Sequence, residues 1–260
     1  MRILITNDDG ISAPGLAVLE AIANDLAGPD GEVWIVAPAY EQSGVSHCIS
    51  YIHPMLLTKA GERRYAVEGS PADCVLAGLF DVLKDTPPDL VLSGVNRGHN
   101  VAEEVLYSGT IGGAIEATLQ GFKAISMSQY YSPQSVKSDD PFEAARNRGA
   151  GICRRLLDDG KWHDQPYGVF YNINFPAIPA ADIKGVKAAV QGRRPDGSFG
   201  IKPQVAPNGR RYLWVSANSQ NTSAGAGTDA REAAEGWITV TPLRADMTAH
   251  DLVSDIAELF

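Results

Sequence analysis

The chain has 260 residues, and its 31 Asp and Glu outnumber its 22 Lys and Arg, which gives a formal net charge of −9 at pH 7. This charge excludes a general affinity for nucleic-acid duplexes or for an anionic membrane surface. The three cysteines form no C-x-x-C pair, and the chain shows neither a leader pattern nor an apolar run of membrane-spanning length, so we expect a cytoplasmic protein with reduced thiols.

The first two thirds of the chain alternate strand and helix patterns. Apolar runs without strict alternation predict buried parallel strands, and apolar residues at helical spacing predict helices. Ser70, three residues before Asp73, predicts a capping box at one helix start. In chain order the pattern predicts a strand at 2–6, a helix at 14–27, a strand at 32–37, a helix at 71–80, a strand at 88–94, a helix at 110–120, a strand at 123–128, a helix at 141–159 and a strand at 168–176.

The character of the sequence changes near Lys184. Three strand-like pieces follow, separated by Gly, Pro and Asn-Gly turn signals, which suggests hairpins and extensions: residues 185–192, 210–216 and 236–243. A last helix is predicted over 248–259, with Thr248 as its cap. We therefore predict an α/β fold with a Rossmann-like, doubly wound and mostly parallel sheet as its core (1–183), and a C-terminal hairpin extension with a terminal helix (184–260) that packs on the core or reaches a neighbouring subunit.

Three polar clusters follow predicted strands of this core. Asp8 and Asp9 come after the first strand, Ser43 lies in the loop after the second, and Asn96 lies just past the third. Ligands of doubly wound sheets bind outside the carboxyl ends of the strands, so these side chains are expected to converge. Adjacent carboxylates repel unless a cation, a proton or water relieves them. This all-oxygen set predicts a site for one divalent cation per subunit, Mg²⁺ or Mn²⁺ rather than Zn²⁺.

A second feature is the helix start at YSGTIGGAIEA. Ser108, Gly109 and Thr110 stand where the helix begins, and free backbone N–H groups there form an anion site. A Ser before a helix is more often only a cap, but next to a cation site it predicts a cradle for a phosphate monoester.

Seven segments, in order and spread along nearly the whole chain, resemble the SurE survival proteins. This family comprises metal-dependent 5'-nucleotidases, also called nucleoside monophosphate phosphohydrolases. The segments are MRILITNDDGISAPG, APAYEQSGVSH, EGSPADCV, PDLVLSGVNRGHN, YSGTIGGAIEA, NINFP and GTDAREAAEGWITVTPL.

The resemblance implies roles for individual residues. The family's metal ligands fall on Asp8, Asp9, Ser43 and Asn96, and its phosphate pocket falls on Ser108, Gly109 and Thr110. It implies a SurE-like fold, a homodimer or homotetramer with interlocked C-terminal segments, and hydrolysis of nucleoside 5'-monophosphates. Whether 3'-monophosphates and short polyphosphate are also cleaved stays open.

The predicted reaction is hydrolysis by a metal-activated water, with Asp8, Asp9 and Asn96 as catalytic residues. Asp8 is a ligand and candidate proton acceptor, and Asn96 also orients the ester. Direct attack by Asp8 stays open as a variant. For His47 and His99, loop packing is favoured over an acid–base role.

A different class of protein must also be considered. A receiver-like signalling domain would share the acidic pair and magnesium, but it needs a phosphoaccepting Asp where this chain has Asn96. A dinucleotide-binding fold would need a G-x-G-x-x-G motif after the first strand, which is missing. A non-catalytic interaction protein on this scaffold would be expected to lack some of the ligands.

Overall fold

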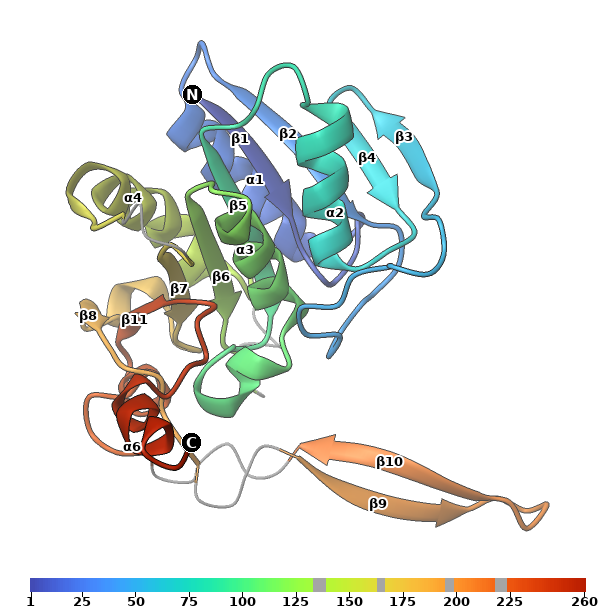
Figure 1. The fold of residues 1–260 in the computed structure, drawn as a ribbon. Helices are drawn as coiled ribbons and strands as arrows, with labels where there is room; N and C mark the ends of the chain where they lie inside the picture. The colour runs from blue at the N-terminus through green and yellow to red at the C-terminus, as the bar shows by residue number, and fades with distance from the viewer. Residues whose placement is uncertain (133–138, 163–166, 195–198, 218–223) are drawn as a thin grey trace.

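The computed structural model describes residues 1–132, 139–162, 167–194, 199–217 and 224–260. Its centre is a nine-stranded sheet in the order β3-β4-β2-β1-β5-β6-β7-β11-β8 (Figure 1). The strands from β4 to β7 are mutually parallel, while β3 and the β11–β8 pair run the other way at the two edges. The bounds are β1 Arg2–Thr6, β2 Glu32–Pro38, β3 Leu57–Gly61, β4 Arg64–Val67, β5 Leu90–Arg97, β6 Ala124–Gln129, β7 Phe170–Phe175, β8 Val186–Ala188 and β11 Ile238–Leu243.

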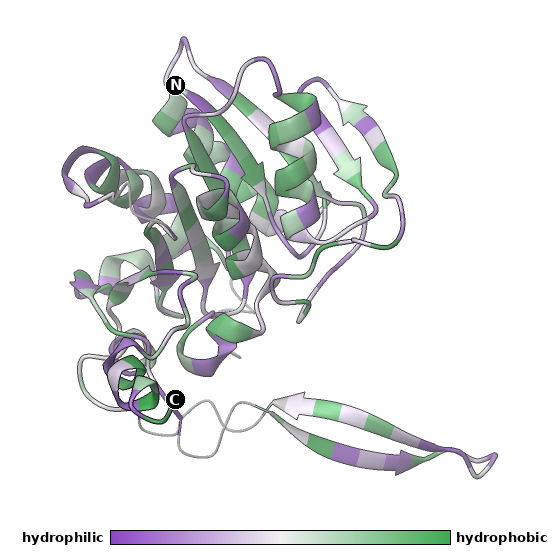
Figure 2. Cartoon of the chain, in the orientation of Figure 1, coloured by the Kyte–Doolittle hydropathy of each residue, from purple (hydrophilic) through white to green (hydrophobic). Residues whose placement is uncertain are grey.

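Helices cover both faces of this sheet and create two hydrophobic cores. Alternate side chains of β1 point to opposite faces, so that Ile3 and Ile5 pack in one core with α1 and α4 while Leu4 packs in the other with α2 and α3. Figure 2 shows the hydrophobic colouring concentrated on the central strands. The helices are α1 Pro14–Ala27, α2 Pro71–Ala77, α3 Gly109–Leu119, α4 Glu143–Asp159, α5 Asp229–Ala234 and α6 Val253–Ala257.

The predicted doubly wound α/β core is confirmed, with differences at its margins. Ser70 and Asp73 form the expected capping box at the start of α2, which continues as a π-helical turn over Gly78–Val82. The strands β3 and β4 were not predicted, because they are short, partly exposed edge strands without a continuous apolar run.

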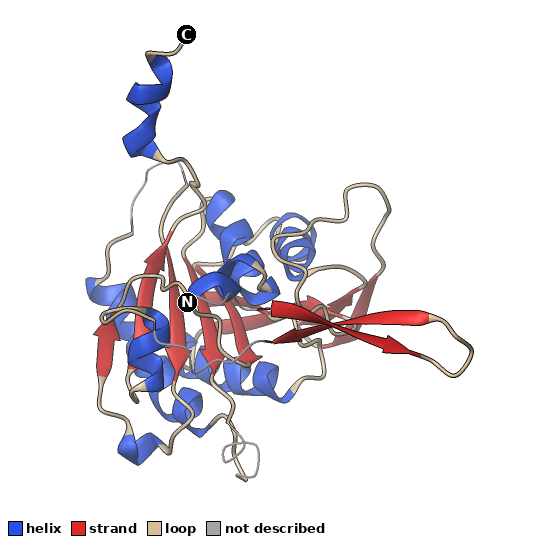
Figure 3. Cartoon of the chain, turned by 90° about the horizontal axis from the view of Figure 1, so that it is seen from below, coloured by secondary structure: helices blue, strands red, loops and turns tan. Residues whose placement is uncertain are grey.

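The C-terminal third differs more from the prediction. Two of the three segments expected to form hairpins or extensions instead join the main sheet as β8 and β11, because the antiparallel pairing of β11 with β7 extends its edge. The predicted hairpin exists as β9 (Phe199–Val205) with β10 (Arg211–Ala217), and it projects from the body (Figures 1 and 3). The last helix is shorter than predicted: Thr248 is not its cap, since α6 follows Leu252 without a side-chain capping bond.

The division of the chain into a core (1–183) and a C-terminal extension (184–260) stays a prediction. Within the described part of the chain, no helix combines the length and the apolar character needed to cross a membrane.

Helix α1 approaches β5 closely at Gly15, and this contact yields a first prediction. A Cβ at Gly15 would lie 2.0 Å from the Val95 carbonyl oxygen, which is backbone and cannot turn aside. Gly15→Ala is therefore expected to lower the free energy of unfolding by about 3 kcal/mol, measured by urea denaturation. Gly151→Ala in α4, where a Cβ meets nothing within 4 Å, is the matched control. If Gly15→Ala and Gly151→Ala had the same free energy of unfolding, the close contact between α1 and the Val95 carbonyl oxygen would be contradicted.

Candidate functional site

Asp8 lies at the carboxyl end of β1 and is held by the start of α3. It is 4% exposed. Thr110 donates its hydroxyl to Asp8 Oδ1 (2.6 Å) and its backbone N–H to Asp8 Oδ2 (3.1 Å). The carboxylate therefore lies against the helix N-terminus that the sequence analysis predicted as an anion site.

The sequence of α3 explains how the helix comes so close. Ser108 is its N-cap and accepts a hydrogen bond from the Ile111 N–H (3.1 Å). Gly109 follows, and a Cβ there would lie 2.9 Å from Asp8 Cβ and 3.2 Å from Asp8 Oδ2. Only a glycine lets the first turn of α3 approach Asp8 at this distance.

Asp9 is bonded to the carboxyl end of β5, at the residue that follows Asn96. The Arg97 N–H donates to Asp9 Oδ2 (2.9 Å), so Asp9 is bound directly beside Asn96 in the chain. Asn96 donates through Nδ2 to the Gly98 carbonyl oxygen (2.9 Å), which leaves its amide oxygen outside this bond. The strand irregularity at Gly94, whose φ is +134° and whose Cβ would lie 2.2 Å from the Met127 carbonyl oxygen, brings the chain into this position.

Ser43 is connected to Arg97, and so to the neighbourhood of Asp9 and Asn96, through Glu41. It is exposed, and its hydroxyl donates to Glu41 Oε1 (2.9 Å), an oxygen that lies 3.9 Å from the Arg97 guanidinium. The preceding residue is tied closer, because the Gln42 N–H donates to the Asp8 carbonyl oxygen (2.7 Å). The structure thus places the loop of Ser43 next to Asp8, and Glu41 stands between Ser43 and Arg97.

Two separate cavities border these residues. Asp9 lines a cavity of about 220 Å³ that includes residues the sequence analysis did not identify: Glu41, Tyr131 and Phe142. Ser108 lines another, of about 610 Å³, together with Ser46 and His47. The acidic pair and the helix start are therefore joined through the Asp8–Thr110 contact, while Asp9 and Ser108 line different cavities. Glu41 could have been suspected, since it lies in the polar loop of Ser43.

The two carboxylates are unfavourably placed for ionisation. Burial raises the pKa of Asp8 to about 6, with the charge of Asp9 adding to the effect and the bonds from Thr110 opposing it. Burial also raises the pKa of Asp9, and the charge of Glu41 contributes, against the lowering effect of Arg97. A positive charge beside Asp8 and Asp9 would lower the pKa of both carboxyl groups and stabilise their ionised forms.

The donor chemistry fits a hard divalent cation. Carboxylate and amide oxygens gather here, and the Oδ1 atom of Asn7, next to Asp8 in the chain, is buried and has no hydrogen-bond partner within the described residues. In the same ranges, no group of three or more His, Cys, Asp and Glu could hold a metal ion. The predicted set contains only two such residues and depends on the amide and hydroxyl oxygens of Asn96 and Ser43.

The other polar residues of these loops have structural contacts. His47 pairs with Glu116 at 2.6 Å, and His99 pairs with Glu104 at 3.1 Å and stacks on Tyr130. Asn100 donates through its side-chain amide to Ser128 Oγ (2.8 Å) and through its backbone N–H to Asn174 Oδ1 (2.8 Å). The bonds of Asn100 brace the loop that follows Asn96 and the end of β5.

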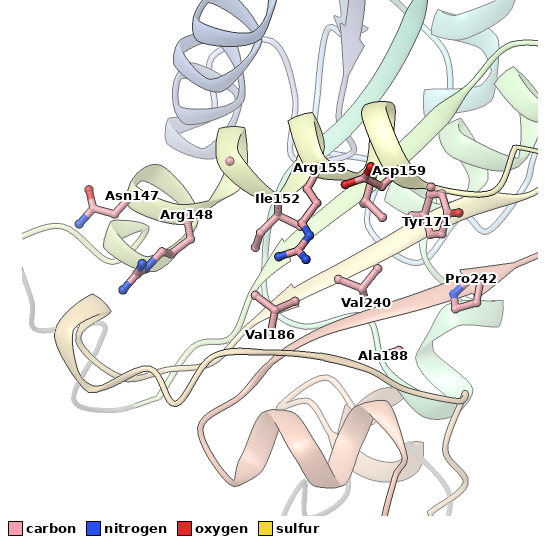
Figure 4. Close-up of a pocket in the computed structure, with 13 residues that line it drawn as sticks. Asn147, Arg148, Ile152, Arg155, Asp159, Tyr171, Val186, Ala188, Val240 and Pro242 are labelled. Carbon is pink, nitrogen blue, oxygen red and sulfur yellow. The ribbon is translucent and has the colours of Figure 1, made fainter.

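A further cavity, of about 570 Å³, lies between α4 and the strands β7, β8 and β11 (Figure 4). Its floor is aliphatic, with Val186 and Val240, and Figure 4 shows the Arg155 side chain extending from α4 toward them. No predicted ligand lines this cavity, so it does not belong to the candidate site.

Comparisons with known proteins agree on one family. The family model described as "Survival protein SurE" matches residues 3–197. A protein of Cereibacter sphaeroides (strain KD131) named "5'-nucleotidase SurE" is 61% identical over 259 residues, covering 100% of this chain and 99% of that protein. One of the same name from Jannaschia sp. (strain CCS1) is 58% identical over 260 residues, with 99% of each chain covered. The crystal structure of the SurE protein from Aquifex aeolicus superposes with a TM-score of 0.82 at 32% identity, covering 100% of this chain and 99% of that one.

Proposed function

The chain belongs to the survival protein SurE family, and from this membership we propose that it hydrolyses nucleoside 5'-monophosphates to nucleoside and phosphate with the help of one divalent cation, Mg²⁺ or Mn²⁺, per subunit. It is an enzyme, a 5'-nucleotidase. The observation that carries the cation part of the proposal is the buried Asp8 carboxylate, which stands beside Asp9 and against the N-terminus of α3.

In this proposal Asp8, Asp9, Ser43 and Asn96 hold the cation. The support is their placement around the ends of β1 and β5, and the tie between the Gln42 N–H and the Asp8 carbonyl oxygen. Asp8 is oriented by two bonds from Thr110, and Asp9 by the Arg97 N–H. When bound, the cation neutralises phosphoryl oxygens and lowers the pKa of the attacking water.

The first turn of α3 is the proposed phosphate site. Ser108, Gly109 and Thr110 lie at the positive end of the helix dipole, which stabilises the charge on the phosphoryl oxygens. The Ser108 N–H donates to the Glu104 carbonyl oxygen and the Thr110 N–H to Asp8 Oδ2, so the N–H proposed to bind a phosphoryl oxygen is that of Gly109. In this proposal Asn96 also orients the ester. Because both Asp8 oxygens accept hydrogen bonds from Thr110, we favour a holding role for Asp8 and water as the nucleophile.

The assembly and location follow from other features. The β9–β10 hairpin and the C-terminal segment 252–260, which contains α6, carry exposed apolar side chains, which is typical of surfaces that associate: Ile201, Val205, Leu213, Trp214, Val215, Leu252, Val253, Ile256, Leu259 and Phe260. They support a homodimer or homotetramer. The three cysteines are all free thiols, which supports the cytoplasm as the location.

The experiment that tests the function is phosphate release from a panel of nucleoside 5'- and 3'-monophosphates and short polyphosphate. Each substrate is offered with Mn²⁺, Mg²⁺ or EDTA. We expect release from 5'-monophosphates with either cation, loss of release in EDTA, and recovery on adding back the metal. The recovery controls for unfolding by the chelator.

Two results would contradict the proposal. Equal release in EDTA and Mn²⁺ would remove the cation from the reaction. A folded protein that releases no phosphate from any substrate would favour the non-catalytic alternative instead. The ranking of substrates measures the base and position preferences.

A further inference from the structure

Helix α3 contacts both Asp8 and the loop of Ser43. Thr110, in its first turn, binds Asp8. Glu116, further along the same helix, binds His47 at 2.6 Å, and His47 lies four residues after Ser43. Because a helix moves as a rigid unit, these contacts fix the position of the Ser43 loop relative to Asp8.

The loop lies tightly against this helix. The Ser46 N–H donates to the Tyr107 carbonyl oxygen (2.9 Å), and the Ser46 hydroxyl to the Leu106 carbonyl oxygen (2.7 Å). A Cβ at Gly112 would lie 2.4 Å from the Ser46 carbonyl oxygen, so the glycine permits the approach. With Gln42 tied to the Asp8 carbonyl oxygen, Ser43 is held on both sides.

Glu116 is an unusual residue for this position. It is only 5% exposed, and a buried carboxylate is costly unless it is paired. Its two oxygens are taken by His47 and by Gln120, whose amide donates at 2.7 Å. Burial raises the pKa of Glu116, but the bonds from His47 and Gln120 lower it by a larger amount. The pKa of Glu116 therefore lies below its ordinary value, and the group is ionised at neutral pH.

We propose that the His47–Glu116 pair is a clasp that positions the Ser43 loop over the cation site, so that breaking it weakens cation binding. This inference rests on the proposed function, and it assigns His47 and Glu116 as positioning residues. The clasp orders the loop in advance, so that binding does not have to bear the entropy cost of ordering it.

The test is the dissociation constant of Mn²⁺ without nucleotide, measured by the electron paramagnetic resonance signal of the free ion. His47→Ala and Glu116→Ala are each expected to weaken binding on the order of 10-fold, and the double variant no more than either alone, because the two groups act as one contact. His47→Gln keeps a donor of similar reach and is expected to restore binding to within about 3-fold of the unaltered protein.

The matched control is His53→Ala. His53 is an exposed histidine of the same loop region, and it makes no hydrogen bond or ion pair with the described residues. It should bind Mn²⁺ as the unaltered protein does. If Glu116→Ala fails to fold, the comparison of His47→Ala with His47→Gln still decides the question.

The outcomes separate the clasp from the function beneath it. Ser43→Ala that weakens Mn²⁺ binding while His47→Ala lowers only the melting temperature would overturn the clasp and leave the proposed cation site intact. If neither the unaltered protein nor any variant binds Mn²⁺, the proposed cation site fails and the clasp with it.

Discussion

Asp8→Asn is expected to reduce phosphate release on the order of 1,000-fold and, in EDTA, to make the protein more stable at pH 7. The loss of activity follows because a neutral amide is a poor replacement for a carboxylate next to a cation. The gain in stability follows because burial raises the pKa of Asp8 to about 6, so the folded protein at pH 7 holds a charge in an unfavourable environment.

The size of the gain can be estimated from linkage. The folded-state pKa lies above the ordinary value of 3.8, so this group opposes folding above pH 6 and its cost disappears as the pH falls toward 4. At pH 7 the removed cost is on the order of 3 kcal/mol. The asparagine can keep both contacts, with its amide oxygen accepting from the Thr110 N–H and its nitrogen donating to Thr110 Oγ1.

The measurement is urea denaturation in EDTA at pH 4.5 and pH 7, with phosphate release in Mn²⁺. The stability difference between the variant and the unaltered protein should be large at pH 7 and small at pH 4.5. Saturating Mn²⁺ should stabilise the unaltered protein more than the variant. A variant that is less stable than the unaltered protein at pH 7 would show that Asp8 supports the fold instead of opposing it.

Gly109→Ala has the second largest expected effect, a loss of phosphate release on the order of 100-fold. The new methyl group would lie 2.9 Å from Asp8 Cβ and 3.1 Å from Pro71 Cγ, so Asp8 or the first turn of α3 must move. A displacement of about 1 Å at a reacting group costs activity of this order. Helix propensity by itself favours alanine, so weakening of α3 would not explain the loss.

Gly151→Ala is the control, because the same substitution in α4 meets open space. It should leave phosphate release unchanged. The comparison requires that Gly109→Ala stays folded, which circular dichroism and the melting temperature would show. Normal activity in a folded Gly109→Ala variant would mean that the contact between α3 and Asp8 is not needed for the reaction.

Much of the core could be predicted because its signals are local. The strand at 2–6 and the helix α1 over Pro14–Ala27 show apolar patterns that depend on near neighbours alone. Ser70 and Asp73 of the capping box are only three positions apart, and the box formed as predicted. The alternation of strands and helices then leaves few topologies, since parallel crossovers have one hand.

The C-terminal third could not be predicted in the same way. The segments that became β8 and β11 have strand patterns like that of the β9–β10 hairpin, and the patterns do not say which strand each one pairs with. β11 pairs with β7 at the open edge of the core sheet, and β8 pairs with β11. That edge exists only after the core has folded.

For the site, the sequence by itself determined which residues are proposed to carry the chemistry: Asp8, Asp9, Ser43, Asn96 and the start of α3. Only the tertiary structure decided how they meet. Three contacts join residues that lie 56 to 102 positions apart in the chain: Thr110 with Asp8, Arg97 with Glu41, and His47 with Glu116. Glu41 also accepts the hydroxyl of Ser43, so that it stands between Ser43 and Arg97. Such contacts depend on the close approach of α3 to β1 and to the Ser43 loop at Gly109 and Gly112, and packing at that distance leaves no periodic pattern in the chain.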